Sequence, residues 1–297
     1  MKKISILFLF FSQFATAQTD SLKALKIAIG AEVGIYVTSM YGLNKLWYAD
    51  YPRSSFHWHN DNDAWLQMDK VGHAYSAYQV GLLGMDMMKW SGVPAKKAIW
   101  YGGAYGAAFL TTIEILDGYS AEWGASWGDL VANTSGSALL IAQELLWKEQ
   151  RIQFKYSFYP SKYADINPDL LGVNTIQQAL KDYNAQTIWL SSNLYEFLPK
   201  SKIPKWLNIA VGYGADGMTS GTLNDQIGII KEESKYISNK RMRQFYLSLD
   251  LDLRKINTGN EFFNKALKVL SFIKIPAPAI MFSNKEIITV YPFYYGQ

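Results

Sequence analysis

Residues 98–113, AIWYGGAYGAAFLTTI, are sixteen consecutive uncharged residues rich in glycine and alanine. Pro94 lies just before them and suits the first turn of a helix, which we expect to run to about Leu116. Gly102 and Gly106 form a G-x-x-x-G step, although glycine inside a helix costs roughly 1 kcal/mol relative to alanine. Close approach of a second helix best explains such positions, as in membrane bundles. The stretch therefore predicts a tightly packed helical bundle.

Three further segments of the first half carry apolar residues at helical spacing. We expect helices over 21–48, 68–90 and 126–147. Ser126 and Asp129 approximate a capping box, with aspartate where glutamate is usual. No segment reaches 18 strongly apolar residues, so whether the helices span a membrane or only contact it stays open. Together with 94–116, these segments predict an N-terminal four-helix unit.

The second half changes to a period of two, which is typical of strands with two different faces. Apolar residues alternate in this way over 207–214 and again in QFYLSLDLDLR, residues 244–254. In the second stretch we expect the leucines to face lipid or the core and the polar residues to face water. The two sets are Leu247, Leu249 and Leu251 on one face, and Ser248, Asp250 and Asp252 on the other.

A short helix over 262–272 and a final strand over 287–293 complete the expected elements. Pro292 marks the end of that strand or an edge of the sheet, because proline cannot donate to a ladder. The fold class predicted is α+β, with a helical domain over 18–150 and a mixed segment over 151–297. The mixed segment is expected to contain a β-hairpin or a small antiparallel sheet.

The first 17 residues, MKKISILFLFFSQFATA, have the form of a secretory signal peptide. Two lysines precede an apolar run over 4–11, and Ala15-Thr16-Ala17 fits a cleavage site. The run is shorter than the roughly 20 residues that a membrane span needs. We therefore expect an exported protein whose mature chain begins at Gln18.

The composition limits which partners and covalent modifications we expect. The formal net charge of +4 falls to +2 when Lys2 and Lys3 are removed, and there is no long basic run, so nucleic acid is not an expected partner. The sequence contains no cysteine, so we expect no disulfide, no zinc–thiolate site and no lipid-modified cysteine. Aromatic residues make up 15% of the chain, and their apolar bodies with polar tips favour membrane interfaces as well as cores.

Polar residues fall near the ends of three expected helices, at spacings that place them on shared faces. If neighbouring helices are antiparallel, these groups meet at one end of the bundle. They are Asp69, Lys70 and His73 on the second helix, Glu114 and Asp117 on the third, and Asp129 and Asn133 on the fourth.

Convergent carboxylates around an imidazole can bind a divalent metal or perform acid–base chemistry. We take Asp69, His73, Glu114, Asp117 and Asp129 as candidate catalytic residues, with Lys70 and Asn133 in support. The alternative is a buried structural network, in which the aspartates cap helices and the histidine bonds to a carboxylate. Glu114 follows sixteen uncharged residues and needs a partner or a function in either case. We expect Asp69, His73 and Glu114 to form one unit, in which the pKa of His73 is raised.

A second possible metal site lies in the loop before the second helix. His57 and His59 alternate around Trp58, and Asp61 and Asp63 follow. Their spacing matches neither H-E-x-x-H nor a calcium-binding loop. The alternative is an aromatic, histidine-rich loop at a surface. The sequence also lacks a P-loop motif, and the cofactor is left open, with a divalent metal as one possibility.

Two stretches carry a family resemblance: DKVGHAYSAYQVG, residues 69–81, and TTIEILDGYSAEWGASWGDLVANTSG, residues 111–136. They resemble bacterial envelope proteins of unknown function typified by the YfiM lipoprotein, over about residues 65–150. A fainter similarity links the order of the polar residues to VanZ-like membrane proteins. The resemblance implies a cell-envelope location and brings no activity with it.

Export, apolar helices and aromatic content together predict a component associated with the outer membrane or the periplasmic face of a membrane. We expect it to be structural or ligand-binding, with membrane lipid as its partner. The alternative is a membrane-associated hydrolase or transferase that acts on a lipid or cell-wall intermediate. It would use the candidate residues Asp69, His73, Glu114, Asp117 and Asp129. The sequence leaves protein partners and oligomeric state open.

Overall fold

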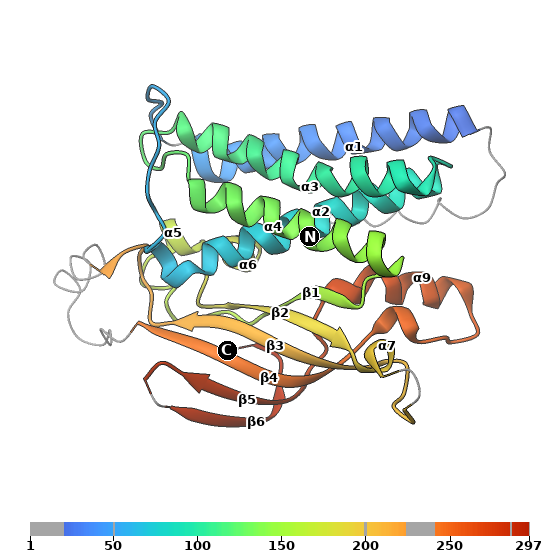
Figure 1. Cartoon of the computed structure of the whole chain (residues 1–297). Coiled ribbons are helices and arrows are strands. Elements are labelled where there is room, and N and C mark those ends of the chain that lie inside the picture. The colour runs from blue at the N-terminus through green and yellow to red at the C-terminus, as the bar shows by residue number, and fades with distance from the viewer. Residues whose placement is uncertain (1–20, 50, 199–200, 224–240, 286, 297) are drawn as a thin grey trace.

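The computed structural model describes residues 21–49, 51–198, 201–223, 241–285 and 287–296. The expected signal peptide and the expected new N-terminus at Gln18 lie outside these ranges. The chain forms a layer of long helices on an antiparallel sheet (Figure 1).

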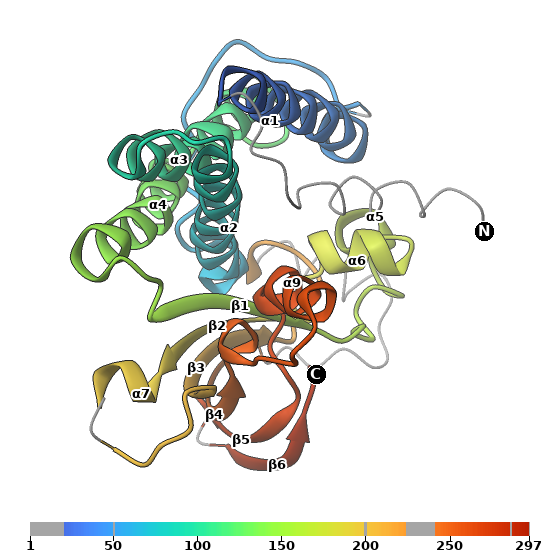
Figure 2. The ribbon, with the colours of Figure 1, turned by 90° about the vertical axis from the view of Figure 1, so that its right-hand side faces the viewer.

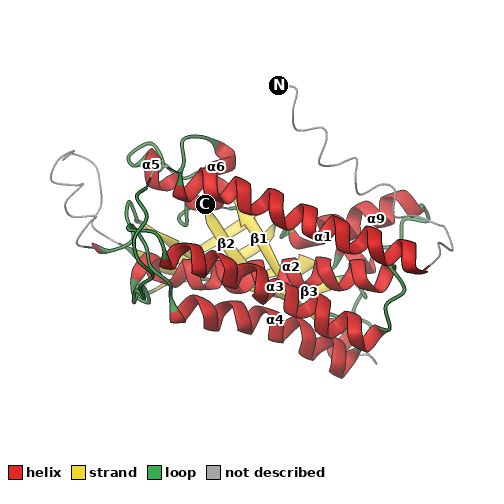
Figure 3. Cartoon of the chain, turned by 90° about the horizontal axis from the view of Figure 1, so that it is seen from above, coloured by secondary structure: helices red, strands yellow, loops and turns green. Residues whose placement is uncertain are grey.

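The four predicted helices lie on one side of the sheet (Figure 3). Their bounds are α1 Ser21–Leu43, α2 Met68–Trp90, α3 Ala95–Gly118 and α4 Trp127–Trp147. α2 and α4 pack on the strands, and α1 lies away from them (Figure 2). A π-type turn, Asn44–Tyr48, follows α1, and a 3-10 turn, Ala64–Gln67, precedes α2. Ser126 is the N-cap of α4, as predicted, and its hydroxyl accepts from the backbone N–H of Asp129. Pro94, predicted for the first turn of α3, is its N-cap, one residue before the helix begins.

The sheet has six strands that are antiparallel and neighbour one another in chain order. They are β1 Ile152–Phe158, β2 Gln186–Asn193, β3 Leu207–Asp216, β4 Met242–Leu251, β5 Ala277–Ser283 and β6 Ile288–Tyr294. Short helices lie between them: α5 Pro168–Leu171, α6 Thr175–Lys181, α7 Leu194–Phe197 and α9 Glu261–Val269, with 3-10 turns Leu253–Lys255 and Leu270–Phe272. The α+β class is confirmed. The predicted final strand forms an edge strand, and Pro292 lies within it.

Glycines let α2 approach α3 and α4 closely. A Cβ atom at Gly106 of α3 would lie 1.9 Å from the carbonyl oxygen of Ala77 in α2. A Cβ atom at Gly136 of α4 would lie 2.0 Å from the carbonyl oxygen of Ala74. Only glycine fits at either contact, so the close packing predicted from the glycine-rich stretch is present.

One hydrophobic core joins the helices to the sheet. Tyr78 of α2 and Leu140 of α4 are almost fully buried against Phe154 of β1 and Ile188 of β2. The ring centroids of Tyr78 and Phe154 are 5.5 Å apart, in an edge-on arrangement. The two halves of the sequence therefore depend on the same buried contacts.

The sheet curls strongly as it leaves the helices (Figure 2). The hydroxyl of Tyr294 in β6 lies 2.8 Å from the hydroxyl of Thr187 in β2, although three strands separate the two in the sheet. Tyr294 also packs on Trp189 and Tyr246. These rings fill the concave side of the sheet.

The concave side is polar as well as aromatic. Lys155 of β1 is fully buried, and its Nζ lies 2.7 Å from Oδ2 of Asp250 in β4. The Ser191 hydroxyl donates to the same carboxylate at 2.6 Å. Lys274 donates to the carbonyl oxygen of Leu249 at 2.8 Å, and burial lowers its pKa to about 8.

The prediction that Ser248, Asp250 and Asp252 face water is therefore wrong: they are 4%, 1% and 0% exposed. Leu247 and Leu249 lie on the outer face instead, 41% and 48% exposed. The physical reason is the curl, which encloses the polar face of β4 with Lys155 and leaves the apolar face outside.

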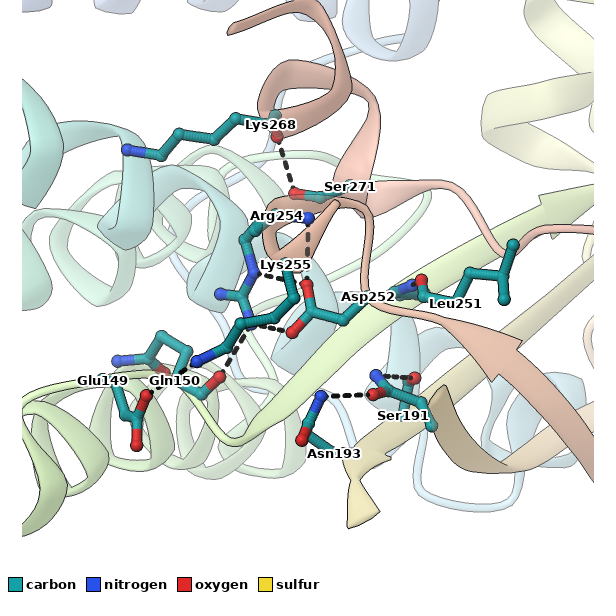
Figure 4. Close-up of polar contacts among 12 residues, drawn as sticks. Glu149, Gln150, Ser191, Asn193, Leu251, Asp252, Arg254, Lys255, Lys268 and Ser271 are labelled. Carbon is teal, nitrogen blue, oxygen red and sulfur yellow. Dashed lines mark hydrogen bonds and ion pairs between the residues drawn. The ribbon is translucent and has the colours of Figure 1, made fainter. Parts of the chain in front are cut away.

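A polar contact network ties the end of the sheet to the helices (Figure 4). Asp252 accepts from Nε and Nη2 of Arg254, both at 3.0 Å. Nη2 of Arg254 also donates to the carbonyl oxygen of Gln150 at 2.7 Å, just after α4. Lys255 pairs with Glu149 at 3.1 Å. Asp252 is thus buried as a helix-cap and ion-pair partner.

The close helix contact predicts the effect of one added methyl group. Gly106→Ala should lower the free energy of unfolding by about 1–3 kcal/mol, because α2 and α3 must separate. Gly34→Ala is the matched control, since a Cβ atom there meets nothing within 4 Å. The control should be neutral or stabilising by up to about 1 kcal/mol. Urea unfolding of both variants measures this, and equal effects would contradict the packing.

Candidate functional site

The predicted polar residues meet at one end of the helical layer. They come from the start of α2, the end of α3, the start of α4 and the loop before α2. We call this set the polar cluster: Asp61, Asp69, Lys70, His73, Glu114, Asp117, Asp129 and Asn133. The cluster forms because α2 and α3 are antiparallel, as are α3 and α4, so the ends that carry these residues coincide.

Lys70 is the cationic centre of one side of the cluster. Its Nζ lies 2.7 Å from Asp61, 3.1 Å from Asp69 and 2.8 Å from Asp129. The Lys70 side chain is 13% exposed, and that of Asp129 is 5% exposed. One ammonium thus joins the loop, α2 and α4.

His73 is the centre of the other side. Its Nδ1 lies 3.0 Å from Oδ1 of Asn133 and 3.6 Å from Oε1 of Glu114. Its Nε2 lies 3.7 Å from Oδ1 of Asp69 and 3.9 Å from Oδ1 of Asp129. Asp69, His73 and Glu114 therefore do meet.

Glu114 also connects the cluster to the start of α4. Its Oε2 accepts from the backbone N–H of Ser126 at 3.0 Å. The Ser126 hydroxyl donates to Asp61 at 2.6 Å and accepts from the backbone N–H of Asp129 at 3.3 Å. A carboxylate and a cap residue thereby satisfy the N-terminus of α4.

Two tyrosines outside this set donate hydrogen bonds to carboxylates of the polar cluster. The Tyr48 hydroxyl donates to Asp117 at 2.6 Å, and the Tyr183 hydroxyl donates to Oδ1 of Asp69 at 2.6 Å. Burial raises the pKa of Tyr183 well above its ordinary value, and the charge of Asp69 adds to this. Sequence reasoning missed both residues. Tyr183 lies 114 positions from Asp69, and no motif marks it.

The carboxyl groups of the polar cluster differ in pKa, and burial is the largest cause. It raises the pKa of Glu114 to about 8, that of Asp117 to about 7 and that of Asp129 to about 6. Burial also acts on Asp69, but the charges of His73 and Lys70 outweigh it, and the pKa of Asp69 lies below its ordinary value.

The pKa of His73 is raised, in the predicted direction. Burial alone would lower it, but Asp69, Asp129 and Glu114 together outweigh that effect. The cluster therefore contains both a carboxyl group that retains its proton near neutral pH and a carboxylate that remains charged, in contact with one imidazole.

The loop histidines contact residues outside the polar cluster. Nδ1 of His57 is 3.2 Å from the Ser54 hydroxyl. The backbone of His59 pairs with that of Ala125 at 2.9 Å. Between the two histidines, Trp58 stacks on Trp127 with ring centroids 4.2 Å apart.

Of the weaker metal candidates, Asp61 joins Lys70, whereas Asp63 precedes the 3-10 turn without a side-chain cap bond. Across the described ranges, one set of three potential ligands has donor atoms within 4.8 Å of one another: Asp69, His73 and Asp129. A hollow of about 340 Å³ lies elsewhere, beside Tyr156, Ile273 and Tyr295.

Residues 57–144 match the model of a family described as "Predicted periplasmic lipoprotein (DUF2279)". The match spans every member of the polar cluster and confirms the family resemblance over this part of the chain. Neither the curated proteins nor the solved structures gave a match. In the described part of the chain, no helix combines the length and the apolar character that crossing a membrane requires.

The family match bears on the location of the protein. The chain is an exported protein of the cell envelope, with a helical region like that of a periplasmic family of unknown function. Lipid attachment in bacterial lipoproteins uses a cysteine, and this sequence contains none.

The geometry around Lys70 predicts a large effect on stability. Lys70→Met should lower the free energy of unfolding by about 3–5 kcal/mol, because three carboxylates lose their shared cation. Adding Asp129→Asn should restore part of the loss, since it removes the most buried of the three charges. Denaturant unfolding of the two single variants and the double variant measures the coupling.

Lys268→Met is the matched control. Lys268 is 60% exposed and pairs with Asp86 at 2.9 Å on the surface. Surface pairs contribute about 0–1 kcal/mol, so this change should have little effect. Equal losses from Lys70→Met and Lys268→Met would mean that Lys70 does not hold the cluster together.

Proposed function

We propose that the protein is a peripheral envelope component that binds membrane lipid, at the outer membrane, through the uncovered outer face of its sheet. One observation carries the proposal. The face of the sheet that packs against the helices at β1 and β2 continues across β3 to β6 as a connected apolar surface.

Strand register defines two rows of this face, in which each residue pairs with the next across the sheet. The first row is Phe154, Leu190, Val211, Leu247, Ile280 and Val290. The second row is Tyr156, Ile188, Tyr213, Phe245, Phe282 and Ile288. Every residue in both rows is apolar or aromatic.

The first row is buried beneath the helices and exposed beyond them. Phe154 is 9% exposed beneath α2, whereas Val211 is 54% exposed and Val290 is 67% exposed. The helices thus cover only one side of an apolar face. Four further side chains extend the open part of this face and are 36–50% exposed: Ile209, Leu249, Phe245 and Phe282. We call this open part the lipid-facing surface.

The chemistry of the surface favours lipid over a protein partner. In β4 the outward positions from Phe245 to Leu251 carry no side-chain hydrogen-bonding group, and the strand backbones are paired within the sheet. Acyl chains require no complementary donors or acceptors, whereas a specific protein interface carries about one hydrogen bond per 100–200 Å². Moving each such side chain from water to hydrocarbon is worth about 1.5–3 kcal/mol on full burial.

Vesicle flotation tests the proposal. The full chain should float with vesicles of phosphatidylethanolamine and phosphatidylglycerol, and Leu247→Ser with Leu249→Ser should weaken binding at least about 100-fold. Both leucines are exposed, so circular dichroism and urea unfolding should stay close to wild type. Ile27→Ser with Ile29→Ser is the matched control on α1, where the two side chains are 44% and 46% exposed. Loss of flotation in the control alone would overturn the assignment to the sheet.

Cysteine labelling separates lipid from a second copy of the chain. A water-soluble thiol reagent should label Leu249→Cys in solution and fail to do so with vesicles present. Ser248→Cys, at a position 4% exposed on the concave side, should resist labelling in both states. Protection of position 249 that rises with protein concentration, without vesicles, would assign the surface to self-association.

The hydrolase or transferase remains a second candidate function, because Asp69, His73 and Asp129 converge from two helices at ion-pair distances. The protein would be incubated with bacterial envelope lipids and lipid-linked cell-wall precursors, and products followed by mass spectrometry. A product that appears with wild type and with Asp86→Asn, but not with Asp129→Asn, is the expected result. Unchanged product with Asp129→Asn would remove the polar cluster from the reaction.

A further inference from the structure

We infer that the polar cluster binds one divalent transition-metal cation through Nε2 of His73, Oδ1 of Asp69 and Oδ1 of Asp129. The inference rests on the geometry around His73. It requires neither lipid binding by the sheet nor enzymatic activity.

The three donor atoms already surround a common point. Nε2 of His73 is 3.7 Å from Oδ1 of Asp69 and 3.9 Å from Oδ1 of Asp129. All three atoms lie within 4.8 Å of one another. Metal–ligand bonds to nitrogen and oxygen are about 2.0–2.2 Å, so small shifts of these side chains would bring the atoms into one coordination sphere.

Lys70 does not bind either of these two aspartate oxygens, although Oδ1 of Asp69 also accepts a hydrogen bond from the Tyr183 hydroxyl. Nζ of Lys70 binds Oδ2 of Asp69 at 3.1 Å and Oδ2 of Asp129 at 2.8 Å. The Oδ1 atoms of both carboxylates point toward His73 instead. Lys70 therefore holds the two carboxylates through their Oδ2 atoms and does not occupy the proposed cation position between the Oδ1 atoms and His73.

Asn133 sets the tautomer that a metal ligand needs. Oδ1 of Asn133 can only accept, so Nδ1 of His73 carries the proton in their 3.0 Å hydrogen bond. The lone pair of neutral His73 then belongs to Nε2, which faces the two aspartates. Metal-binding histidines commonly donate their other ring N–H to an oxygen acceptor in this way.

Unpaired buried atoms point to a missing partner. Oδ1 of Asp129, Oε1 of Glu114 and Nδ2 of Asn133 have no hydrogen-bond partner, and their residues are 3%, 2% and 0% exposed. Native proteins rarely leave such groups unsatisfied. A cation on Oδ1 of Asp129 would satisfy that atom directly and offset the excess of carboxyl groups over Lys70 and His73.

The ligand types select the class of cation. One imidazole with two carboxylates suits zinc, manganese or iron, whereas calcium and magnesium prefer sites made of oxygen alone. Three protein ligands also leave a position for water, as in open metal sites. We therefore expect Zn²⁺ and Mn²⁺ to bind, and Ca²⁺ and Mg²⁺ to bind much more weakly.

Equilibrium dialysis of the full chain against MnCl₂ or ZnCl₂, with elemental analysis, tests the inference. We expect one Mn²⁺ or Zn²⁺ per chain. Pulsed electron paramagnetic resonance of the Mn²⁺ form should show coupling to one imidazole nitrogen, and His73→Gln should abolish that coupling. Asn133→Ala, which frees the ring tautomer, should weaken binding about 10–100-fold.

Matched variants distinguish metal binding at this site from nonspecific binding to carboxylates and from loss of the fold. Asp129→Asn keeps the side-chain shape and should weaken binding more than Asn133→Ala does. His57→Ala with His59→Ala should leave the stoichiometry unchanged, and Asp86→Asn controls for a surface carboxylate that is absent from the cluster. Thermal unfolding identifies any variant that fails to fold, and the nitrogen coupling in folded wild-type protein then decides the question.

Several results would overturn the inference. These are no cation bound by the folded full chain, binding without nitrogen coupling, or binding unchanged in His73→Gln. Loss of binding in the double variant of His57 and His59 would move the metal site to the loop. Flotation with vesicles is measured separately, so failure of the metal site leaves the lipid-facing surface standing.

Discussion

Close contact of α2 with its two neighbours is the constraint on which the rest of the structure depends. Gly106 and Gly136 bring the backbones of α3 and α4 against Ala77 and Ala74 of α2, at distances that no side chain permits. One turn before Ala77, this packing sets His73 between Glu114 and Asp129. Tyr78, next to Ala77, is directed into the core shared with the sheet. Helix spacing thus fixes both the polar cluster and the attachment of the sheet.

Sequence periodicity predicted the helices and their shared faces well, because both depend on local geometry. Asp69 and His73 lie on one face since residues four apart always do. Convergence with Glu114 and Asp129 needed only short connections between antiparallel helices. Tyr183 was beyond such reasoning, because its contact with Asp69 depends on how the loop between β1 and β2 folds back over the bundle. Long-range contacts of this kind leave no spacing in the sequence.

The sheet shows the limit of binary patterning. Alternation in β4 established that leucines and polar residues lie on opposite faces, and it could not state which face is enclosed. That choice depends on Lys155 and Lys274, which lie 95 and 24 residues from Asp250 and carry no pattern of their own. β5 was not predicted because both of its faces carry apolar residues, with Ala279 and Met281 buried and Ile280 and Phe282 exposed. β1 and β2 were not predicted because residues buried on both faces lose the alternation. β1 and β2 have this character beneath the helices.

The sheet encloses polar residues on its concave side and exposes apolar residues on its outer side. This arrangement is stable only if both faces have surroundings of matching polarity. On the concave side, Asp250 is fully buried with Lys155, a costly arrangement that is tolerated because Ser191 and backbone carbonyls complete the hydrogen bonds. On the outer side, water is a poor solvent for the rows through Val211 and Leu247. At β1 and β2 the helices cover the apolar residues of this face. Beyond the helices the rows remain apolar across β3 to β6. In the proposed lipid-bound state, hydrocarbon would give β3 to β6 the same apolar surroundings that α2 gives Phe154, and this is the argument for lipid as the partner of the open part of this face.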